Sequence, residues 1–317
     1  MRALRDGLFA VLLAVMLRQA SSAKEPTTMD IRKKPEKWSS QKLTQFINDP
    51  NNAPKVDYPP NGTHPQPDIA GTRVSPVLSS QIIGGTTAAS KQFPWQVYII
   101  SDGAWLCGGS IISEIFILTA AHCVYKRVTF VVTAGGVTRN TVETGEIVMT
   151  STVKIVHENY NPVRIWNDIA LIRVPHNYTF NDFIKPIRLP KTSDANKTFS
   201  GILATASGFG KTSNLGATSQ TLMFVNLKVI SNSECSRSYG SGIISSIVCT
   251  AAYVAKSICS GDSGGPLTYN ESDAKQTIIG VVSFGSAKSC TRYPAGYSRV
   301  TSFLGWISTK TGIAVQP

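Results

Sequence analysis

The sequence is poor in metal-binding patterns, with only four histidines and six cysteines in 317 residues. It contains neither a Cys-x-x-Cys pair nor a His-Glu-x-x-His segment, two spacings that are typical of zinc ligands. These absences argue against a zinc enzyme. We therefore expect neither a metal ion nor another cofactor.

Long apolar runs are also missing. The run near the start extends over 11 residues, from Gly7 to Leu17, whereas a membrane-spanning helix needs roughly 20. Arg2 and Arg5 precede this run and small residues follow it at 21–23, a pattern typical of a secretory signal peptide. We expect a signal peptide over residues 1–23, and a secreted, extracellular protein with no membrane partner.

Acidic residues are fewer than basic ones, 19 against 31, which gives a formal net charge of +12. The sequence has no basic run of five or more residues and no alternation of aromatic and basic residues. A nucleic-acid partner is therefore not expected. We interpret the excess charge as a solubility feature, and attraction to anionic surfaces is the alternative.

Residues 24–81 lack cysteine and are rich in proline, asparagine, serine and lysine. This composition predicts a largely disordered pro-segment with at most one short helix, near residues 41–48. The residues alone leave open whether the segment is a linker or binds something.

From Ile82 the sequence changes to short β-prone runs separated by Gly, Asn, Ser and Pro. Even spacing of such runs predicts an all-β sandwich or barrel over residues 82–317. Ser302 followed by Phe303, Leu304, Trp306 and Ile307 predicts a capped C-terminal helix. The expected strands are residues 96–100, 110–118, 129–133, 152–157, 169–174, 222–230 and 277–284.

Secretion would place the cysteines in an oxidising compartment, where an even number favours disulfides over a metal site. Spacing alone does not choose among the possible pairings. Four Asn-x-Ser/Thr sequons suit an exported surface, each as an acceptor only where it is exposed: Asn61, Asn177, Asn196 and Asn270.

A nucleophile pattern occurs at 261–265, where Gly-Asp-Ser-Gly-Gly satisfies Gly-x-Ser-x-Gly. Alone this pattern is a weak signal. An α/β-hydrolase would carry its histidine after the serine, but all the histidines precede Ser263. The α/β-hydrolase reading is therefore excluded.

Five ordered segments identify a family. Ile-Ile-Gly-Gly at 82–85, Thr-Ala-Ala-His-Cys at 119–123, Asp-Ile-Ala-Leu at 168–171, Gly-Asp-Ser-Gly-Gly-Pro at 261–266 and Ser-Phe-Gly at 283–285 resemble the trypsin/chymotrypsin family in order and in spacing. The resemblance covers Ile82 to about Gly312. It implies two packed six-stranded antiparallel β-barrels, with the active site in the cleft between them and the chain crossing near 191–207.

The resemblance implies a catalytic triad of His122, Asp168 and Ser263. A serine hydroxyl becomes a nucleophile when a neighbouring imidazole takes its proton, and the aspartate fixes the imidazole's tautomer. The backbone N–H groups of Gly261 and Ser263 would form the oxyanion hole. The other histidines have no role here, since His157 and His176 are expected on the surface and His64 lies outside the folded domain.

The resemblance also implies how the cysteines pair: Cys107 with Cys123, Cys235 with Cys249, and Cys259 with Cys290. Further bridges of vertebrate relatives are absent, a pattern more like that of invertebrate members. We expect the protein to be a monomeric serine endopeptidase that acts on proteins or peptides, with protein protease inhibitors as further partners.

By resemblance, Ser257 forms the floor of the substrate pocket, where trypsin-like members have Asp. A neutral floor does not compensate a desolvated cation, so we expect a chymotrypsin-like preference for large apolar or aromatic residues. The remaining expected pocket residues are Ser283, Phe284, Gly285 and Ala295.

Activation is the point at which the sequence departs from the family. Relatives are cut after Arg or Lys, and the new amine pairs with the Asp before the nucleophile, here Ile82 with Asp262. This chain has Gln81 before Ile82, and the nearest basic residue is Arg73. We expect an activating protease that cuts after Gln81, either directly or after a first cut at Arg73.

Two alternatives from other classes remain. A non-catalytic homologue that keeps the fold usually lacks a triad residue, and none is lacking here. A basic surface-binding protein would leave the triad segments unexplained.

Overall fold

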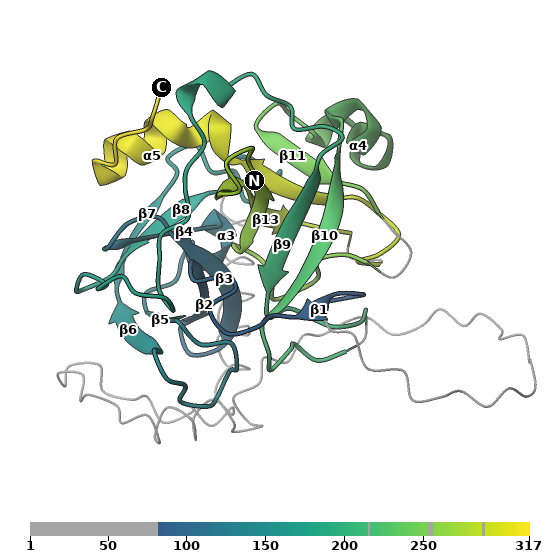
Figure 1. Cartoon of the computed structure of the whole chain (residues 1–317). Helices are drawn as coiled ribbons and strands as arrows, with labels where there is room; N and C mark the ends of the chain where they lie inside the picture. The colour runs from purple at the N-terminus through teal and green to yellow at the C-terminus, as the bar shows by residue number, and fades with distance from the viewer. Residues whose placement is uncertain (1–81, 215, 253–255, 287–288) are drawn as a thin grey trace, which may run out of the picture. The chain divides into compact units, whose positions relative to one another are not determined.

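The computed structural model describes residues 82–317 apart from 215, 253–255 and 287–288, which Figure 1 draws in grey together with 1–81. The expected signal peptide, pro-segment and helix at 41–48 lie outside the described residues, as do Gln81 and Asn61. Each of the two main groups of strands in Figure 1 is one antiparallel sheet.

The first sheet contains seven antiparallel strands in the order β6-β5-β2-β3-β4-β8-β7. Only Thr152 separates β6 from β7, so the two form one interrupted strand and the sheet follows a six-strand path. The strands are β2 (Gln96–Ser101), β3 (Trp105–Ile111), β4 (Phe116–Thr119), β5 (Phe130–Ala134), β6 (Ile147–Ser151), β7 (Val153–Val156) and β8 (Ala170–Arg173).

The second sheet has the order β1-β10-β11-β14-β13-β12-β9, and a further pairing of β9 with β10 closes it. Six strands make the closed barrel, and the two-residue β1 is added at β10. The strands are β1 (Thr86–Thr87), β9 (Leu203–Gly208), β10 (Met223–Ile230), β11 (Ile247–Thr250), β12 (Pro266–Asn270), β13 (Gln276–Phe284) and β14 (Ala295–Arg299). The expected all-β fold with two six-stranded barrels is confirmed.

Hydrophobic patterning explains why these segments are strands. In β10, Val225 and Leu227 are buried while Asn226 and Lys228 are exposed, because successive side chains of a strand point to opposite faces. Strand β13 is buried at seven consecutive positions, as expected for a strand covered on both faces.

One expected strand, residues 110–118, is in fact parts of two. The chain leaves β3 after Ile111 and turns, with the Ser113 hydroxyl accepting hydrogen bonds from the amides of Ile115 (3.4 Å) and Phe116 (3.2 Å). A serine that bonds to the backbone in this way offers an alternative to strand pairing. The continuous apolar run therefore hid a turn.

Six further strands were not predicted, namely β1, β6, β9, β11, β12 and β14. Strands β9 and β14, Leu-Ala-Thr-Ala-Ser-Gly and Ala-Gly-Tyr-Ser-Arg, consist largely of small residues. Small residues have weak β-propensity, and only their partners in the closed barrel make them strands.

The described residues include three α-helices, α3 (Ala121–Val124), α4 (Asn232–Tyr239) and α5 (Leu304–Thr311), and three short 3-10 turns at 192–194, 240–242 and 300–303. The expected C-terminal helix is present, but the expectation that Ser302 caps it is wrong. Ser302 lies inside the 3-10 turn, and the residue before α5 is Phe303, which makes no side-chain cap. None of the helices described is long and apolar enough to cross a membrane.

Helix α5 packs its buried Leu304 and Ile307 into the core of the first sheet. The His157 ring lies 5.3 Å from the Phe303 ring and 5.2 Å from the Trp306 ring. Partial burial lowers the pKa of His157. The expectation that His157 is a plain surface residue is therefore wrong, because the helix that covers it comes from far along the chain, whereas His176 is exposed as expected.

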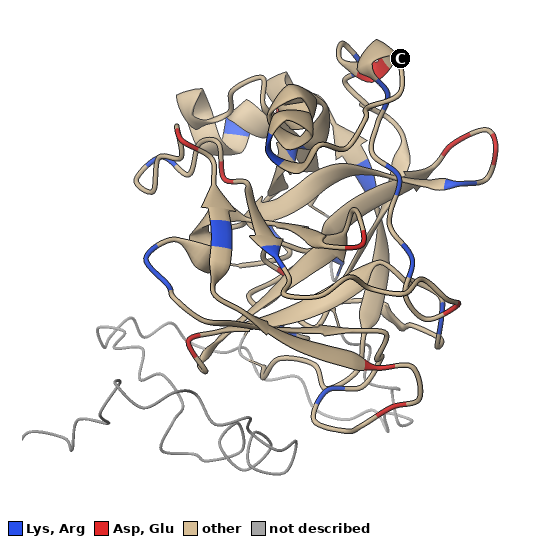
Figure 2. Ribbon diagram, turned by 90° about the vertical axis from the view of Figure 1, so that its left-hand side faces the viewer, with Lys and Arg blue, Asp and Glu red and all other residues tan. Residues whose placement is uncertain are grey.

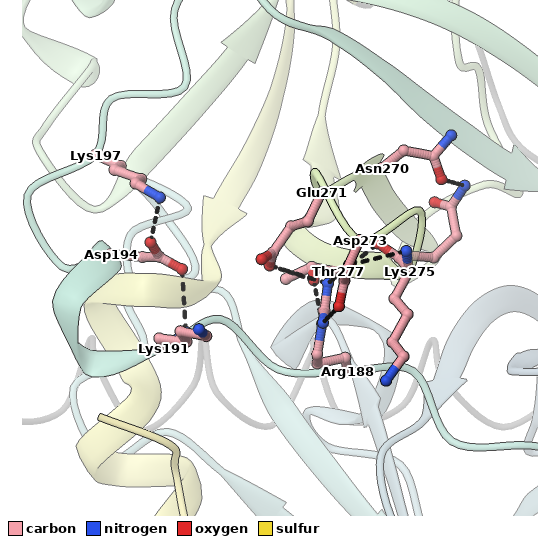
Figure 3. Close-up of polar contacts among 10 residues, drawn as sticks. Arg188, Lys191, Asp194, Lys197, Asn270, Glu271, Asp273, Lys275 and Thr277 are labelled. Atoms are coloured by element: carbon pink, nitrogen blue, oxygen red, sulfur yellow. Dashed lines mark hydrogen bonds and ion pairs between the residues drawn. The ribbon is translucent and has the colours of Figure 1, made fainter.

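Ion pairs join Arg188, which lies in the linker between β8 of the first sheet and β9 of the second, to the β12–β13 turn, as Figure 3 shows. The Arg188 guanidinium lies 2.7 Å from Asp273 and 3.3 Å from Glu271, and its Nε donates to Thr277 (2.8 Å). A forked guanidinium that binds two carboxylates holds a defined geometry better than a lone surface pair does. This cluster fixes the linker against the second sheet.

The three pairings that the resemblance implied are all present, with Cα–Cα distances of 6.2, 6.3 and 5.4 Å. They are Cys107–Cys123, Cys235–Cys249 and Cys259–Cys290.

Sequon residues Asn177, Asn196 and Asn270 are exposed. In the view of Figure 2, Lys and Arg positions are spread over several strands and loops rather than gathered in one run.

Candidate active site

Two hydrogen bonds join Asp168 and His122. His122 is the second residue of the short helix α3 that follows β4, and Asp168 precedes β8, the strand paired with β4. His122 Nδ1 lies 2.7 Å from Asp168 Oδ2, and the His122 backbone N–H donates to Oδ1 at 2.9 Å. With Nδ1–H directed at the carboxylate, Nε2 is left to accept a proton.

Asp168 is fully buried, and a buried carboxylate needs several donors. Besides His122, the Ser283 hydroxyl donates to Oδ2 at 2.6 Å, and the Ser298 hydroxyl donates to the Asp168 carbonyl oxygen at 2.7 Å. Both serines come from the second sheet, in β13 and β14. We expected Ser283 only as a pocket residue, and nothing in its local sequence indicates that its hydroxyl reaches Asp168.

Ser263 lies on a turn between β11 and β12 that docks on the first sheet. The Ser263 carbonyl oxygen accepts a hydrogen bond from the Gly108 amide at 2.7 Å. A methyl group on Gly264 would lie 2.2 Å from Thr119 Oγ1 and 3.1 Å from the Ala120 amide nitrogen, so this glycine packs against the residues just before His122. Its φ of +82° also favours glycine. The structure thus brings the serine loop and the histidine loop together.

No hydrogen bond joins the Ser263 hydroxyl to His122 in this structure. Hydrogen bonds between a nucleophile and its base are often long without substrate and tighten in the complex. Within the described part of the chain, the backbone amides of Gly261 and Ser263 also donate to no protein acceptor. Gly261 has a φ of +98°, which orients the amides of this turn.

Asp262 is fully buried between the glycines of a neighbouring loop. Its carboxylate accepts hydrogen bonds from the amides of Gly210 (2.8 Å) and Cys259 (2.9 Å), with no cationic side chain paired to it among the described residues. A methyl group on Gly208 or Gly210 would lie within 2.4 Å of the carboxyl group. Burial raises the pKa of Asp262 to about 6, although the two amide donors act in the opposite direction.

Ile82 is fully buried, and the chain after it runs beside the expected pocket. The Ile83 carbonyl oxygen accepts a hydrogen bond from the Ser257 amide at 3.1 Å. Ser257 is itself buried. The start of the described chain and the expected pocket floor are therefore neighbours.

The other expected pocket residues lie on β13 and β14 or between them. Ser283 and Ala295 are buried, Phe284 is half-buried and Gly285 is exposed. A methyl group on Gly296 would lie 2.2 Å from the Phe284 ring, so the absence of a side chain there makes room for the ring. The Phe284 ring also meets the Tyr239 ring at 5.3 Å.

Among the described residues, Cys107, His122 and Cys123 place three potential metal donors within 4.8 Å of one another. The two sulfurs are joined in a disulfide. They are therefore not thiolates, the form in which cysteine binds metal.

Comparison with known proteins finds a family match over the part of the chain that the structure describes. The family model described as Trypsin matches residues 82–307. The chain belongs to the trypsin family of serine proteases. Membership makes it a hydrolase of the serine endopeptidase type, with proteins as its substrates.

Similar members of the trypsin family carry different names. The chain is 40% identical to the collagenase of Hypoderma lineatum over 74% of this chain and 88% of that protein. It is 37% identical to trypsin alpha-4 of Lucilia cuprina over 73% of this chain and 88% of that protein. A solved structure titled HL collagenase is 40% identical, with a TM-score of 0.67, and covers 74% of this chain and all of that one.

Proposed function

We propose that this trypsin-family member is a secreted serine endopeptidase, made as a zymogen, that cuts peptide bonds with Ser263, His122 and Asp168. The observation that carries the proposal is the pair formed by His122 and the fully buried Asp168, held from the opposite sheet by Ser283. A carboxylate is expensive to bury, and this one is directed at a half-exposed imidazole beside a serine loop. Catalysis accounts for that arrangement directly.

In the proposed mechanism His122 Nε2 takes the proton of the Ser263 hydroxyl as the oxygen attacks the substrate carbonyl. Asp168 keeps the proton on Nδ1 and stabilises the imidazolium that forms. His122 then gives the proton to the leaving amine, which leaves an acyl group on Ser263. Water attacks this ester by the same route and releases the acid.

The developing negative charge on the carbonyl oxygen needs fixed donors, and we assign them to the backbone N–H groups of Gly261 and Ser263. Support comes from their lack of a protein acceptor in the described structure. Loss of one such donor typically costs about 3 kcal/mol of transition-state stabilisation.

For specificity we propose a large apolar or aromatic residue on the acyl side of the cut bond. Ser257 is buried and neutral, and its amide donates to the Ile83 carbonyl oxygen near the start of the described chain. An uncompensated Lys or Arg side chain would lose its hydration there without gaining a partner. The names of the relatives, collagenase and trypsin, do not decide between preferences, so a substrate series is needed.

The triad is tested by Ser263→Ala in the activated enzyme. We expect hydrolysis of peptide amides to fall roughly 10⁶-fold, because the triad acts as one unit. Retention of more than a tenth of the activity would refute the assignment. Wild-type protein labelled by a serine-directed phosphonate, with no label on the variant, distinguishes an enzyme from a non-catalytic homologue.

Specificity is tested with substrates that differ only in the residue on the acyl side of the cut bond. We expect Phe, Tyr and Leu substrates to have a higher kcat/KM than Arg and Lys substrates. The reverse order would show that the neutral floor is assigned wrongly, while leaving the triad intact.

A further inference from the structure

An exposed tryptophan begins β3, the strand whose Gly108 amide donates to the Ser263 carbonyl oxygen. It is Trp105, and 49% of it is exposed, which is unusual for so large an aromatic residue. The Arg127 guanidinium lies over its ring, with Cζ 4.1 Å from the ring centroid. Stacking of this kind holds a guanidinium flat and leaves its edge free for a planar anion.

The positive charge of Arg127 has no ion-pair partner among the described residues. Asp102 is the acid whose charge acts on Arg127, and its carboxylate accepts from the amides of Val128 and Thr129, each at 2.9 Å. The Nε atom of Arg127 is buried without a hydrogen-bond partner in the described structure. Such an atom costs free energy. Because Nε is buried, pairing with an anion falls to the two Nη atoms, which make no protein hydrogen bond in the described structure.

Two ties hold the stack close to the reacting groups. Trp105 precedes Cys107 by two residues, and Cys107 is bonded to Cys123, the neighbour of His122. Leu106 reaches across to the oxyanion turn, since a methyl group on Gly261 would lie 3.5 Å from Leu106 Cδ2. Arg127 itself follows α3, the helix that carries His122.

The direction in which a substrate would run places this stack on the leaving-group side. The acyl-side pocket residues lie in the second sheet or its loops, whereas the proton for the leaving amine comes from His122, in the helix that follows β4 of the first sheet. The released segment must therefore begin beside His122 and continue over the first sheet. Leu106 is the first-sheet residue next to the oxyanion turn, and Trp105 precedes it at the start of β3.

We propose that Trp105 and Arg127 form a subsite for an acidic side chain within the first few residues after the cut bond. The inference rests on the proposed endopeptidase function and adds a substrate class to it. A carboxylate would pair with the free edge of the guanidinium, and the ring would cover the adjoining aliphatic part of the substrate. Residues 82–317, which the proposed active enzyme keeps, carry 20 Lys and Arg against 12 Asp and Glu, and this positive excess favours the same substrates.

The test uses internally quenched peptides that are identical on the acyl side and carry Glu, Gln or Lys at the second and third positions after the cut. For the activated wild-type enzyme we expect kcat/KM in the order Glu, Gln, Lys, with a Glu-to-Lys ratio of about 10 at low salt that shrinks at high salt. No preference for Glu in the wild type overturns the subsite.

Arg127→Gln should bring the Glu-to-Lys ratio close to unity, and Trp105→Ala should lower it. Lys126→Gln is the matched control, because it removes the same charge from the adjacent residue, whose ammonium lies over Tyr125 instead. Since each variant is judged by a ratio, a general loss of activity cancels. An equal fall of the ratio in the control and in Arg127→Gln would show a diffuse field and overturn the subsite.

A chromogenic anilide separates the two levels of the proposal, because it has no residue beyond the cut bond. Failure of activated wild-type protein to cut the anilide contradicts the endopeptidase function itself. Cleavage of the anilide and the peptides without discrimination contradicts only the subsite.

Discussion

Ser283 links the two sheets at the candidate site, because its hydroxyl belongs to β13 while its acceptor, Asp168, precedes β8. A single side chain thus makes the orientation of Asp168 depend on the docking of one sheet on the other. A hydrogen bond to a charged group contributes about 1.5 to 3 kcal/mol. The residue therefore has a positioning role that its place beside the expected pocket does not reveal.

Ser283→Ala is expected to lower kcat/KM by roughly 10- to 100-fold, because Asp168 Oδ2 loses a buried donor. The anilide assay measures the loss, and Ser283→Thr, which keeps the hydroxyl, should recover most of the activity. Ser298→Ala is the control, since it removes a donor to the Asp168 carbonyl oxygen rather than to the carboxylate. Equal losses in the Thr and Ala variants would contradict a hydrogen-bonding role.

At the scale of elements, the loop between β5 and β6 carries two carboxylates close together. Glu143 Oε2 accepts from the amides of Val137 and Thr138, whereas Glu146 Oε2 is buried without a partner in the described structure. Burial, together with the charge of Glu143, raises the pKa of Glu146 to about 7. The folded loop thus disfavours an ionised Glu146.

Because the pKa of Glu146 is higher in the folded than in the unfolded chain, its contribution to stability falls as pH rises from about 4.5 to about 7. Glu146→Gln should therefore stabilise the protein at pH 8, by about 1 kcal/mol once partial exposure is allowed for, and have little effect near pH 4. Urea unfolding at both pH values, with a chelator present and Ser263→Ala as the background, measures the difference.

Glu143→Gln is the matched control for this loop, since it removes the same charge but weakens the acceptor of two backbone amides. It should not give the same gain at pH 8. A Glu146→Gln effect of equal size at pH 4 and pH 8 would show that ionisation is not the cause.

At the scale of the whole molecule, we propose that the pro-segment at 24–81 is removed after Gln81 and that export precedes the cut. Among the described residues Asp262 is buried without a cationic side chain as partner, and the chain after Ile82 lies along Ser257. A new amine at Ile82 would supply the missing positive charge. Sequencing of the active enzyme should find Ile82 first, and full activity in an uncut form would contradict the scheme.

Asp262 should also give the uncut protein a distinct pH dependence. Its folded-state pKa of about 6 exceeds the ordinary 3.8, so stability from this group is greatest at low pH and falls as pH rises between those values. In the Ser263→Ala background, the uncut protein should lose up to about 3 kcal/mol more than its Asp262→Asn variant over this range. The cut protein should lack that loss if the new amine pairs with Asp262.

How much the sequence predicts can be judged from particular residues. The order of the segments around His122, Asp168 and Ser263 indicated the family and the two barrels, because short patterns in a fixed order and spacing can be recognised from the sequence alone. Strand positions were predicted well where large apolar and β-branched residues form most of the strand, as in β10 and β13. They were missed where small residues form β9 and β14, since pairing in the closed barrel makes those segments strands.

The sequence by itself determined the family, the fold class and the identity of the candidate catalytic residues. Only the tertiary structure decided which distant side chains serve them: Ser283 and Ser298 on Asp168, Gly208 and Gly210 around Asp262, and Arg127 over Trp105. Each of these contacts joins residues brought together by sheet packing. A motif records neighbours along the chain, whereas burial, hydrogen bonding and ring stacking depend on neighbours in space.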